Sequence, residues 1–324
     1  MSLLLPPSLR PGDTIAIIPT ARAITVEELR DGIALAESWG LNVKLGAGIG
    51  RKHFQQASTA LERAADLQAA IQDPLVKAIW CARGGYGTVR LMEHLDLSPL
   101  LKDPKWIVGF SDVTVLHNAL HNLGISSLHA QMPHNIGVKT AACVETLRRA
   151  LFGANYEVAS GERQAASARQ PELAAKDSPL AADRIGTCEA ELIGGNLSLL
   201  YALRGTPYDI DPRGKILFIE DLDELLYHVD RMVMNLQLAG WFKELAGLVV
   251  GGMADMHDRN PADPFGQSAE AIIAQAVAPY TYPVCYGFPA GHIPDNRALV
   301  LGQKVKLSVT GRGATLSFGE RSVA

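Results

Sequence analysis

The sequence predicts a two-domain α/β protein, in which a helix-covered parallel sheet is followed by an α+β or barrel-like domain. The chain has 324 residues, and a globular domain commonly holds about 150. Between Thr14 and Phe152, short β-rich runs alternate with helical patterns, and this alternation is typical of a parallel sheet with helical connections. Beyond residue 184 the pattern is more mixed, which indicates a second domain of a different kind.

The first half of the chain alternates strands with helices. Val26, Leu29 and Ile33 recur at helical spacing, so the first helix has one apolar stripe that can face a sheet. The predicted strands cover 14–19, 41–45, 76–82 and 106–110, and the predicted helices cover 26–39, 61–71, 89–95, 113–123 and 144–152.

The second half begins after a change in composition. Residues 159–183 are dominated by Ala, Gln, Ser, Arg and Glu and keep neither a strand nor a helix period, which indicates an interdomain connection. An apolar run follows around Leu192, then a helix at 197–203, a strand at 216–219, an amphipathic helix over 225–236, a strand at 248–251 and short β segments over 298–318. The predicted division is therefore 1–157, 158–184 and 185–324.

Composition and charge exclude several classes of function. Thirty Lys and Arg against 34 Asp and Glu give a net charge of −4, and the sequence has no long basic block, so we expect no nucleic-acid partner. The four cysteines form no C-x-x-C pair that would suggest a zinc or redox motif. The chain shows neither a signal-peptide pattern nor an apolar run near 18 residues. We therefore expect a cytoplasmic protein without a membrane partner.

The segment 105–117 contains a candidate nucleophile, Ser111. A hydrophobic strand ends at Gly109 and a helix begins almost at once, so Ser111 stands at a turn above the carboxyl edge of the sheet. Backbone N–H groups at the following helix N-terminus can stabilise an oxyanion there. A plain helix N-cap is the alternative, favoured by this segment alone. The second glycine of G-x-S-x-G is also absent.

A glycine-rich turn, Arg83-Gly-Gly-Tyr-Gly, follows the strand that ends near residue 82. Because both turns belong to the carboxyl edge of one sheet, where ligands usually bind, the amides of Gly84 and Gly85 could face Ser111. A tight turn without function is the alternative. The chain lacks the G-x-x-x-x-G-K-[ST] pattern of a phosphate loop.

A serine nucleophile needs a base and an orienting acid, and the second half offers both. Glu220 follows the run Ile216-Leu-Phe-Ile, and His292 lies in Gly291-His-Ile-Pro-Asp-Asn. The chain order Ser, acid, His is compatible with a triad, which is defined by geometry and not by order. Taken singly, Glu220 is more typical of a helix start and His292 of a surface loop.

Two other clusters favour structural roles. His117 and His121 stand at i and i+4 but lack the glutamate of H-E-x-x-H, so we predict no metal site. Cys81 lies inside a strand-like run and is expected to be a small buried side chain, although a cysteine nucleophile there is a further alternative.

Taken together, the motifs resemble the LD-carboxypeptidase family over nearly the whole chain. The shared motifs are Thr14-Ile-Ala-Ile-Ile-Pro, Arg83-Gly-Gly-Tyr-Gly, Gly109-Phe-Ser-Asp-Val-Thr-Val-Leu-His, Ile219-Glu-Asp, Asp230-Arg-Met and Gly291-His-Ile-Pro-Asp-Asn. The resemblance implies a flavodoxin-like or amidotransferase-like N-terminal domain and a smaller barrel-like C-terminal domain. It also implies that Ser111 is the nucleophile, His292 the general base and Glu220 the orienting acid. Backbone N–H groups of Gly85 and Asp112 would form the oxyanion hole.

The resemblance further implies a reaction and a setting. Family members typically cleave the L,D bond to the terminal D-alanine of murein tetrapeptides during cell-wall recycling in the cytoplasm, without metal or cofactor, and tend to form homodimers. The candidates for contact with the peptide substrate are Arg83, Gly84, Tyr86 and Arg231.

Two stretches depart from the family pattern, namely Gln56-Ala-Ser-Thr-Ala and His129-Ala-Gln-Met-Pro. These departures leave the shape of the substrate open. A microcin C immunity-type hydrolase of aminoacyl or peptidyl nucleotide analogues is a second hypothesis, which an adenine-stacking aromatic such as Tyr86, Trp241 or Phe265 would favour. A noncatalytic peptide-binding protein is a third.

Overall fold

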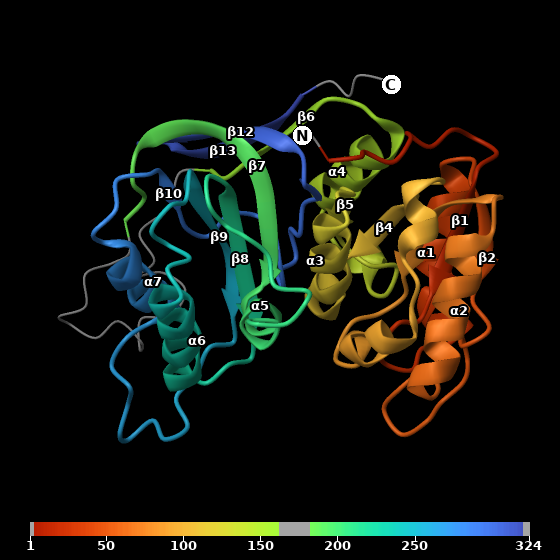
Figure 1. Cartoon of the computed structure of the whole chain (residues 1–324), viewed down its shortest axis with the longest axis horizontal. Coiled ribbons are helices and arrows are strands. Elements are labelled where there is room, and N and C mark those ends of the chain that lie inside the picture. The colour runs from red at the N-terminus through yellow and green to blue at the C-terminus, as the bar shows by residue number, and fades with distance from the viewer. Residues whose placement is uncertain (1–2, 162–181, 320–324) are drawn as a thin grey trace.

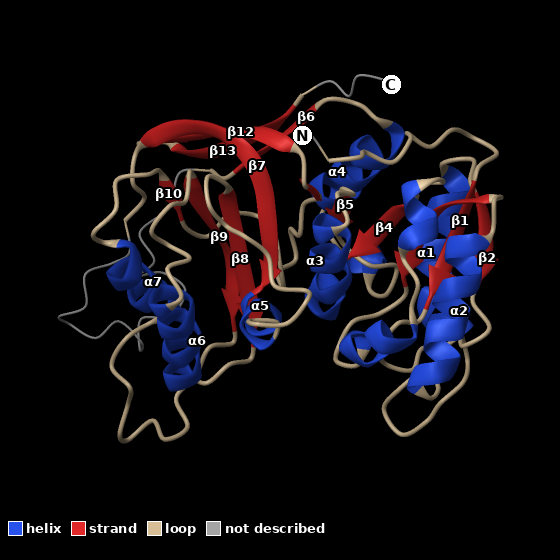
Figure 2. Cartoon of the chain, in the orientation of Figure 1, coloured by secondary structure: helices blue, strands red, loops and turns tan. Residues whose placement is uncertain are grey.

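The computed structural model describes residues 3–161 and 182–319. Its two sheets lie next to each other with helix α3 (Thr114–Asn122) between them (Figure 1), and α3 contacts a strand of each sheet. Helices pack beside both sheets, as the colouring by secondary structure shows (Figure 2). The predicted two-domain α/β class is confirmed.

The first sheet has the strand order β11-β5-β4-β3-β1-β2. Its five N-terminal strands run parallel, as the alternation of strands and helices predicts. The predicted ranges 14–19, 26–39 and 76–82 each differ by one residue from the observed elements, whereas the helix predicted at 89–95 is a 3-10 helix at Thr88–His94. The elements are β1 (Thr14–Ile18), α1 (Val26–Ser38), β2 (Asn42–Leu45), α2 (Ala60–Gln72), β3 (Val76–Cys81), η1 (Thr88–His94), η2 (Ser98–Leu101), β4 (Trp106–Gly109), η3 (Ser111–Val113), β5 (Ser127–His129), η4 (Ile136–Val138) and α4 (Ala141–Phe152).

Capping boxes fix the starts of the first two long helices. The Thr25 hydroxyl accepts a hydrogen bond from the Glu28 amide at 3.3 Å, and the Glu28 carboxylate accepts one from the Thr25 amide at 2.8 Å. Thr59 and Glu62 repeat this arrangement at the start of α2. Each box satisfies amides that a helix N-terminus leaves unpaired, so both helices begin beside the predicted positions.

The second sheet has the order β10-β9-β8-β7-β12-β13-β6. Strands β7 to β10 pair in parallel, whereas β12, β13 and β6 pair antiparallel. The sequence did not indicate α7, whose nine residues are mostly small and apolar and show no clear polar face. The elements are β6 (Tyr156–Ala159), β7 (Gly186–Asn196), α5 (Leu197–Ala202), β8 (Ile216–Leu222), α6 (Leu226–Leu238), β9 (Gly247–Ala254), α7 (Ala269–Val277), β10 (Val284–Cys285), β11 (Leu299–Leu301), β12 (Lys304–Thr310) and β13 (Gly313–Phe318).

The two sheets exchange strands at their junction. β6 starts at Tyr156, before the predicted boundary at 157, and pairs with β13 of the second sheet. β11 comes from the C-terminal part and pairs antiparallel with β5 of the first sheet. Most of the predicted connection 158–184 lies outside the described residues.

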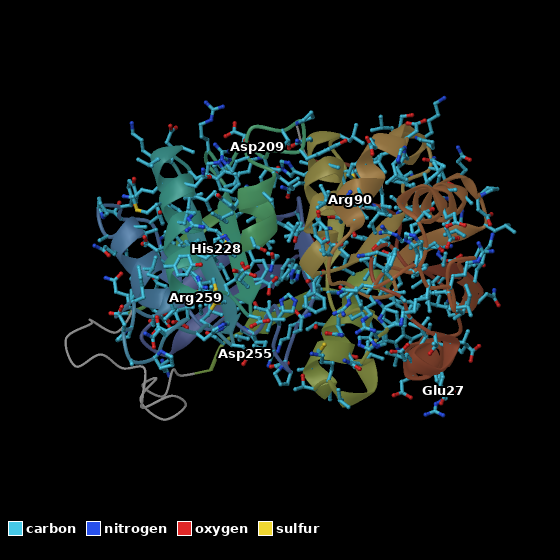
Figure 3. The ribbon with its side chains drawn as sticks, turned by 90° about the horizontal axis from the view of Figure 1, so that it is seen from below. Glu27, Arg90, Asp209, His228, Asp255 and Arg259 are labelled. Carbon is cyan, nitrogen blue, oxygen red and sulfur yellow. The ribbon has the colours of Figure 1, made fainter. Side chains whose placement is uncertain are left out.

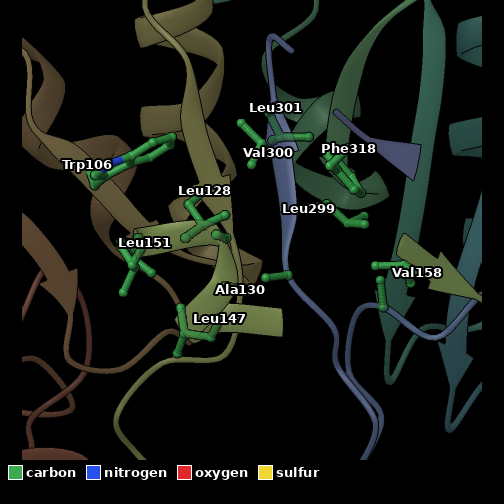
Figure 4. Close-up of a cluster of buried hydrophobic side chains, with 14 of the residues drawn as sticks. Trp106, Leu128, Ala130, Leu147, Leu151, Val158, Leu299, Val300, Leu301 and Phe318 are labelled. Atoms are coloured by element: carbon green, nitrogen blue, oxygen red, sulfur yellow. The ribbon is translucent and has the colours of Figure 1, made fainter. Parts of the chain in front are cut away.

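One apolar core continues through the junction. The side chains of β11 lie between Trp106 and Leu128 on the first-sheet side and Val158 and Phe318 on the second (Figure 4). All of these side chains are buried. Among the described residues, no helix combines the length and the apolar character that a membrane span requires.

Candidate active site

Ser111 stands at a strained turn directly after β4. Its φ is +64°, in the left-handed region that non-glycine residues seldom adopt. Gly109 allows this turn, because a Cβ there would come within 2.8 Å of a Val113 methyl group. Ser111 is half-buried and opens the short helix η3. The turn places the hydroxyl at the carboxyl edge of the sheet, as in the strand-to-helix turns that carry nucleophilic serines.

The structure brings Ser111, His292 and Glu220 into one hydrogen-bonded chain. His292 Nε2 lies 3.0 Å from Ser111 Oγ, and His292 Nδ1 lies 2.6 Å from Glu220 Oε2. The same carboxylate oxygen accepts the backbone N–H of His292 at 3.1 Å. The Phe110 ring packs against the imidazole with its centroid 4.8 Å away. The serine comes from the first sheet, whereas the other two groups come from the C-terminal half.

Glu220 and His292 are held by a tightly packed loop. Glu220 is fully buried within β8, which extends to Leu222 and past the predicted strand end at 219. Gly291 has a φ of +102°, and a Cβ there would lie 2.7 Å from Glu220 Oε2. Asn296 Oδ1 accepts the Gly291 amide at 2.8 Å. The loop can therefore approach the carboxylate only with glycine at position 291.

Electrostatics keep the acid ionised. Burial acts to raise the pKa of Glu220, but the charge and hydrogen bonds of His292 outweigh it, so this pKa lies below 4.5. Burial likewise acts to lower the pKa of His292, but the Glu220 carboxylate outweighs it and holds this pKa above 6.5. A buried carboxylate placed in this way can stabilise an imidazolium that forms beside it.

The glycine-rich loop between β3 and η1 lies against the serine. A Cβ at Gly84 would be 3.4 Å from Ser111 Oγ, and Gly85 has a φ of +108°. The Gly85 amide donates to no acceptor in the described part of the chain. Asp112 follows the serine at the start of η3, so its amide lies on the same turn.

Buried side chains support this loop from behind. Asp112 Oδ2 accepts the Thr88 amide at 2.8 Å, and Arg63 donates to the Gly87 carbonyl at 3.2 Å. Burial raises the pKa of Asp112 despite the opposing hydrogen bonds and the nearby Arg63. The Asp112 carboxylate thus supports the loop, and only its backbone is available to the site.

The proposed substrate contacts fall into two places. Arg83, Gly84 and Tyr86 share the loop beside Ser111, where Tyr86 is 54% exposed. The Arg83 guanidinium is engaged by the Ala23 carbonyl at 3.3 Å and by the Glu28 carboxylate at 3.5 Å. Arg231 lies instead on α6 in the second domain, with its guanidinium 5.3 Å from the centre of the Tyr227 ring.

The residues considered for a cysteine nucleophile or a metal site, Cys81, His117 and His121, have structural roles. Cys81 is fully buried, and burial raises the pKa of its thiol to about 12, so no reactive thiolate is available at neutral pH. His117 contacts Ser127 Oγ and the Gly109 carbonyl, whereas His121 contacts Glu191.

The aromatic candidates differ in accessibility. Trp241 is buried, with the Arg204 guanidinium 5.0 Å from its ring. Phe265 is 39% exposed and lies in the loop before α7. Tyr86 alone of the three belongs to the loop that lies against Ser111.

His129 is a site neighbour that sequence patterns did not single out. Its buried ring packs between Phe110 and Phe218, with ring centroids 5.9 and 4.9 Å away. Burial lowers the pKa of His129 to about 4, so the ring is neutral at pH 7 and adds no charge beside Glu220. In the sequence, a single histidine at the end of a strand gives no indication that it packs beside the candidate triad. Asn296 ends the shared motif Gly291-His-Ile-Pro-Asp-Asn, but its hydrogen bond to the Gly291 amide was not predicted.

Comparison with known proteins decides the family. The model of the LD-carboxypeptidase N-terminal domain matches residues 15–130, and that of the C-terminal domain matches residues 189–307. The chain belongs to the LD-carboxypeptidase family. The probable murein peptide carboxypeptidase of Bacillus subtilis is 35% identical over 97% of this chain and 94% of its own length. The predicted resemblance is confirmed, and the chain is a peptidase by family.

Other relatives share the whole architecture. The crystal structure of muramoyltetrapeptide carboxypeptidase from Oxalobacter formigenes has a TM-score of 0.79 at 28% identity and covers 94% of this chain and 99% of its own. The microcin C7 self-immunity protein MccF of Escherichia coli is 22% identical over 97% of this chain and 96% of its own. This last likeness shows a common fold and leaves the substrate open.

Proposed function

We propose that this protein is a serine-type LD-carboxypeptidase that removes the terminal D-alanine from murein tetrapeptides. The observation that carries the proposal is the continuous hydrogen-bonded chain from Ser111 Oγ through His292 to the buried Glu220 carboxylate. Three groups in this order form the arrangement that activates a serine hydroxyl.

Catalysis begins when Ser111 Oγ attacks the carbonyl carbon of the L,D peptide bond. His292 Nε2 takes the hydroxyl proton as the new C–O bond forms, and Glu220 stabilises the imidazolium. The negative charge that develops on the carbonyl oxygen is bound by the amides of Gly85 and Asp112. One such donor is typically worth about 10²- to 10³-fold in rate.

The second half of the cycle returns the enzyme to its starting state. The C–N bond breaks as His292 gives its proton to the leaving nitrogen, and D-alanine departs from a Ser111 ester. His292 then takes a proton from water, the resulting hydroxide attacks the ester carbonyl, and the proton returns to Ser111 Oγ. Protein groups and water account for every step, so the proposal includes no metal or cofactor.

We propose the substrate class from the names of the relatives, and the cellular setting from the family resemblance. Two of them are named as carboxypeptidases of murein peptides, in Bacillus subtilis and in Pseudomonas aeruginosa. Both names support a murein peptide as the substrate. A cytoplasmic location, a role in recycling of the cell wall and a homodimeric enzyme are what the family resemblance implies.

One observation favours a second candidate function. Tyr86 is an exposed aromatic side chain on the loop that lies against Ser111, and an aromatic ring at such a place can stack on a nucleobase. Hydrolysis of an aminoacyl or peptidyl nucleotide analogue, as considered for an MccF-like protein, would use the same three catalytic groups.

A substrate panel separates the two functions. Purified protein is incubated in parallel with L-Ala-γ-D-Glu-meso-diaminopimelyl-D-Ala and with an aminoacyl sulfamoyl adenosine, and the products are followed by mass spectrometry. We expect D-alanine release from the tetrapeptide and at most slow cleavage of the nucleotide analogue. Cleavage of the analogue alone would move the assignment to the second function. Cleavage of neither by folded protein would contradict both and leave a peptide-binding role.

A further inference from the structure

A carboxypeptidase must distinguish the last residue of a peptide from an internal one, and it does so by binding the terminal carboxylate. An arginine is well suited, because its planar guanidinium donates two parallel hydrogen bonds to a carboxylate. The two arginines suggested by the sequence are placed for other contacts. Arg83 is engaged by Glu28 and Ala23, and Arg231 stacks on Tyr227 of α6.

A third arginine, Arg22, lies directly on the glycine-rich loop. A Cβ at Gly85 would come within 2.5 Å of Arg22 Cγ and 3.6 Å of Arg22 Nε. The Arg22 side chain therefore crosses the face of Gly85, whose neighbour Gly84 lies against Ser111 Oγ. This proximity is invisible in the sequence, because Arg22 follows β1 whereas Gly85 follows β3.

The Arg22 backbone is held in place on both sides. The Ala23 amide donates to the Gln55 carbonyl at 2.9 Å, and the Ala57 amide donates to the Ala21 carbonyl at 3.1 Å. Arg22 itself forms an antiparallel bridge with Gln56. The segment that holds it includes Gln56-Ala-Ser-Thr-Ala, one of the two stretches in which this chain departs from the family pattern.

The Arg22 guanidinium is available for a ligand. Its side chain is exposed, and within residues 3–161 and 182–319 no hydrogen bond or ion pair occupies it. Arg63 offers a contrast, because it is buried and donates to the carbonyls of Thr20 and Gly87. A charged donor beside the reacting groups and without a protein partner is suited to an anionic group of the substrate.

We propose that Arg22 binds the C-terminal carboxylate of the residue that leaves, and this assignment rests on the function proposed above. The terminal carboxylate is bonded to the carbon next to the scissile nitrogen. The carboxylate is therefore only a few covalent bonds from the scissile carbonyl oxygen. When the Gly85 and Asp112 amides bind that oxygen, the carboxylate lies close to Gly85. The Arg22 side chain crosses Gly85, so its guanidinium is near the place where the carboxylate lies.

The assignment competes with a second role for the same side chain. A guanidinium beside Gly85 could instead stabilise the oxyanion of the tetrahedral intermediate. The two roles differ in their dependence on the substrate, because every substrate forms the oxyanion whereas only a free acid carries the terminal carboxylate.

The test compares two substrates with three variants. The tetrapeptide ending in D-alanine and the same peptide ending in D-alaninamide are given to wild type, Arg22→Ala and Arg22→Lys, and kcat and KM are measured for release of the terminal residue. For the acid, Arg22→Ala is expected to raise KM about 10- to 100-fold, the range of a hydrogen bond to a charged group, while kcat changes little. For the amide, the three proteins should behave alike, and Arg22→Lys should recover part of the loss on the acid.

Arg30→Ala is the matched control. Arg30 is an exposed arginine of α1 that pairs with Glu27, and Glu27 points outward at the edge of the molecule (Figure 3). This variant should match wild type on both substrates. An equal loss on acid and amide in Arg22→Ala, or no loss on either, would overturn the carboxylate assignment alone. Failure of wild type to cleave the acid would overturn the proposed function and, with it, the assignment of Arg22.

Discussion

The pairing of Glu220 with His292 should set the pH dependence of catalysis. The base must be neutral to accept the serine proton, so kcat/KM is expected to rise as pH rises through the pKa of His292, which lies above 6.5. Glu220→Gln removes the charge that contributes most to raising this pKa, and burial, which lowers it, is then the largest remaining influence on the imidazole. The rise in kcat/KM should therefore move to lower pH, and kcat should fall about 10⁴-fold, as for the equivalent change in a Ser-His-Asp enzyme. A pH profile of D-alanine release tests this, and an unchanged inflection would contradict the role of Glu220.

Cys81 gives a second prediction at the level of single residues. Its thiol is buried and its pKa is raised to about 12, so iodoacetamide should not modify it in the folded protein, and activity should survive the treatment. Peptide mapping after alkylation, with urea-unfolded protein as the positive control, measures the modification. Loss of activity in step with modification of Cys81 would revive the cysteine-nucleophile alternative.

The predictability of the site differs from residue to residue. Glycine turns and strand ends drew attention to Ser111 and Gly85. Glu220 and His292 were proposed as the acid and the base because a serine nucleophile needs both, and the family resemblance strengthened that proposal. Taken singly, Glu220 and His292 favoured structural roles. Arg22 and His129 were not predicted, because their significance depends on contacts between segments that are distant in the chain.

At the level of elements, the loop between β3 and η1 should depend on its buried support. Asp112→Ala leaves the Thr88 amide without its acceptor and Arg63 without a nearby negative charge. The free energy of unfolding should fall by about 1–3 kcal/mol, the cost of a buried group left unsatisfied. Activity should fall as the loop loses its position. Urea unfolding and D-alanine release measure the two effects.

Asp263→Ala is the control for this prediction. Asp263 is exposed and lies in the loop before α7, so its removal should change neither stability nor rate by much. Full stability and activity in Asp112→Ala would show that the loop holds its position without the carboxylate.

Elements with local signals were predicted and elements without them were not. The capping boxes at Thr25 and Thr59 and the apolar stripe of α1 fix those helices from nearby sequence. α7 has no such stripe, because buried small and apolar side chains cover most of its surface. β11 reads as part of the C-terminal domain, yet it pairs with β5, since the choice of a strand partner depends on tertiary packing and not on local pattern.

At the level of the whole molecule, the two sheets should unfold together. One hydrophobic cluster includes residues of both sheets, and each sheet contains a strand from the other half of the chain. Cooperative units usually follow such shared packing. Differential scanning calorimetry should therefore give a single transition. Two resolved transitions would show that the sheets are stable independently.

The same arrangement explains why the candidate active site requires both halves of the chain. Ser111 follows a strand of the first sheet, whereas Glu220 lies in the second sheet and His292 lies in the loop between β10 and β11. The predicted boundaries 1–157, 158–184 and 185–324 would separate Ser111, the proposed nucleophile, from His292, its proposed base. They would also separate β5 from β11, a consequence of the crossing strands that the linear sequence does not reveal.

The central claim is that Ser111 attacks the substrate, and one measurement tests it most directly. D-alanine release from the tetrapeptide is compared between wild type and Ser111→Ala at equal concentrations of protein shown to be folded. We predict release by wild type and a loss of about 10⁶-fold in the variant, the scale seen when a catalytic serine is removed, with binding of the peptide retained. Comparable release by both proteins would contradict the account.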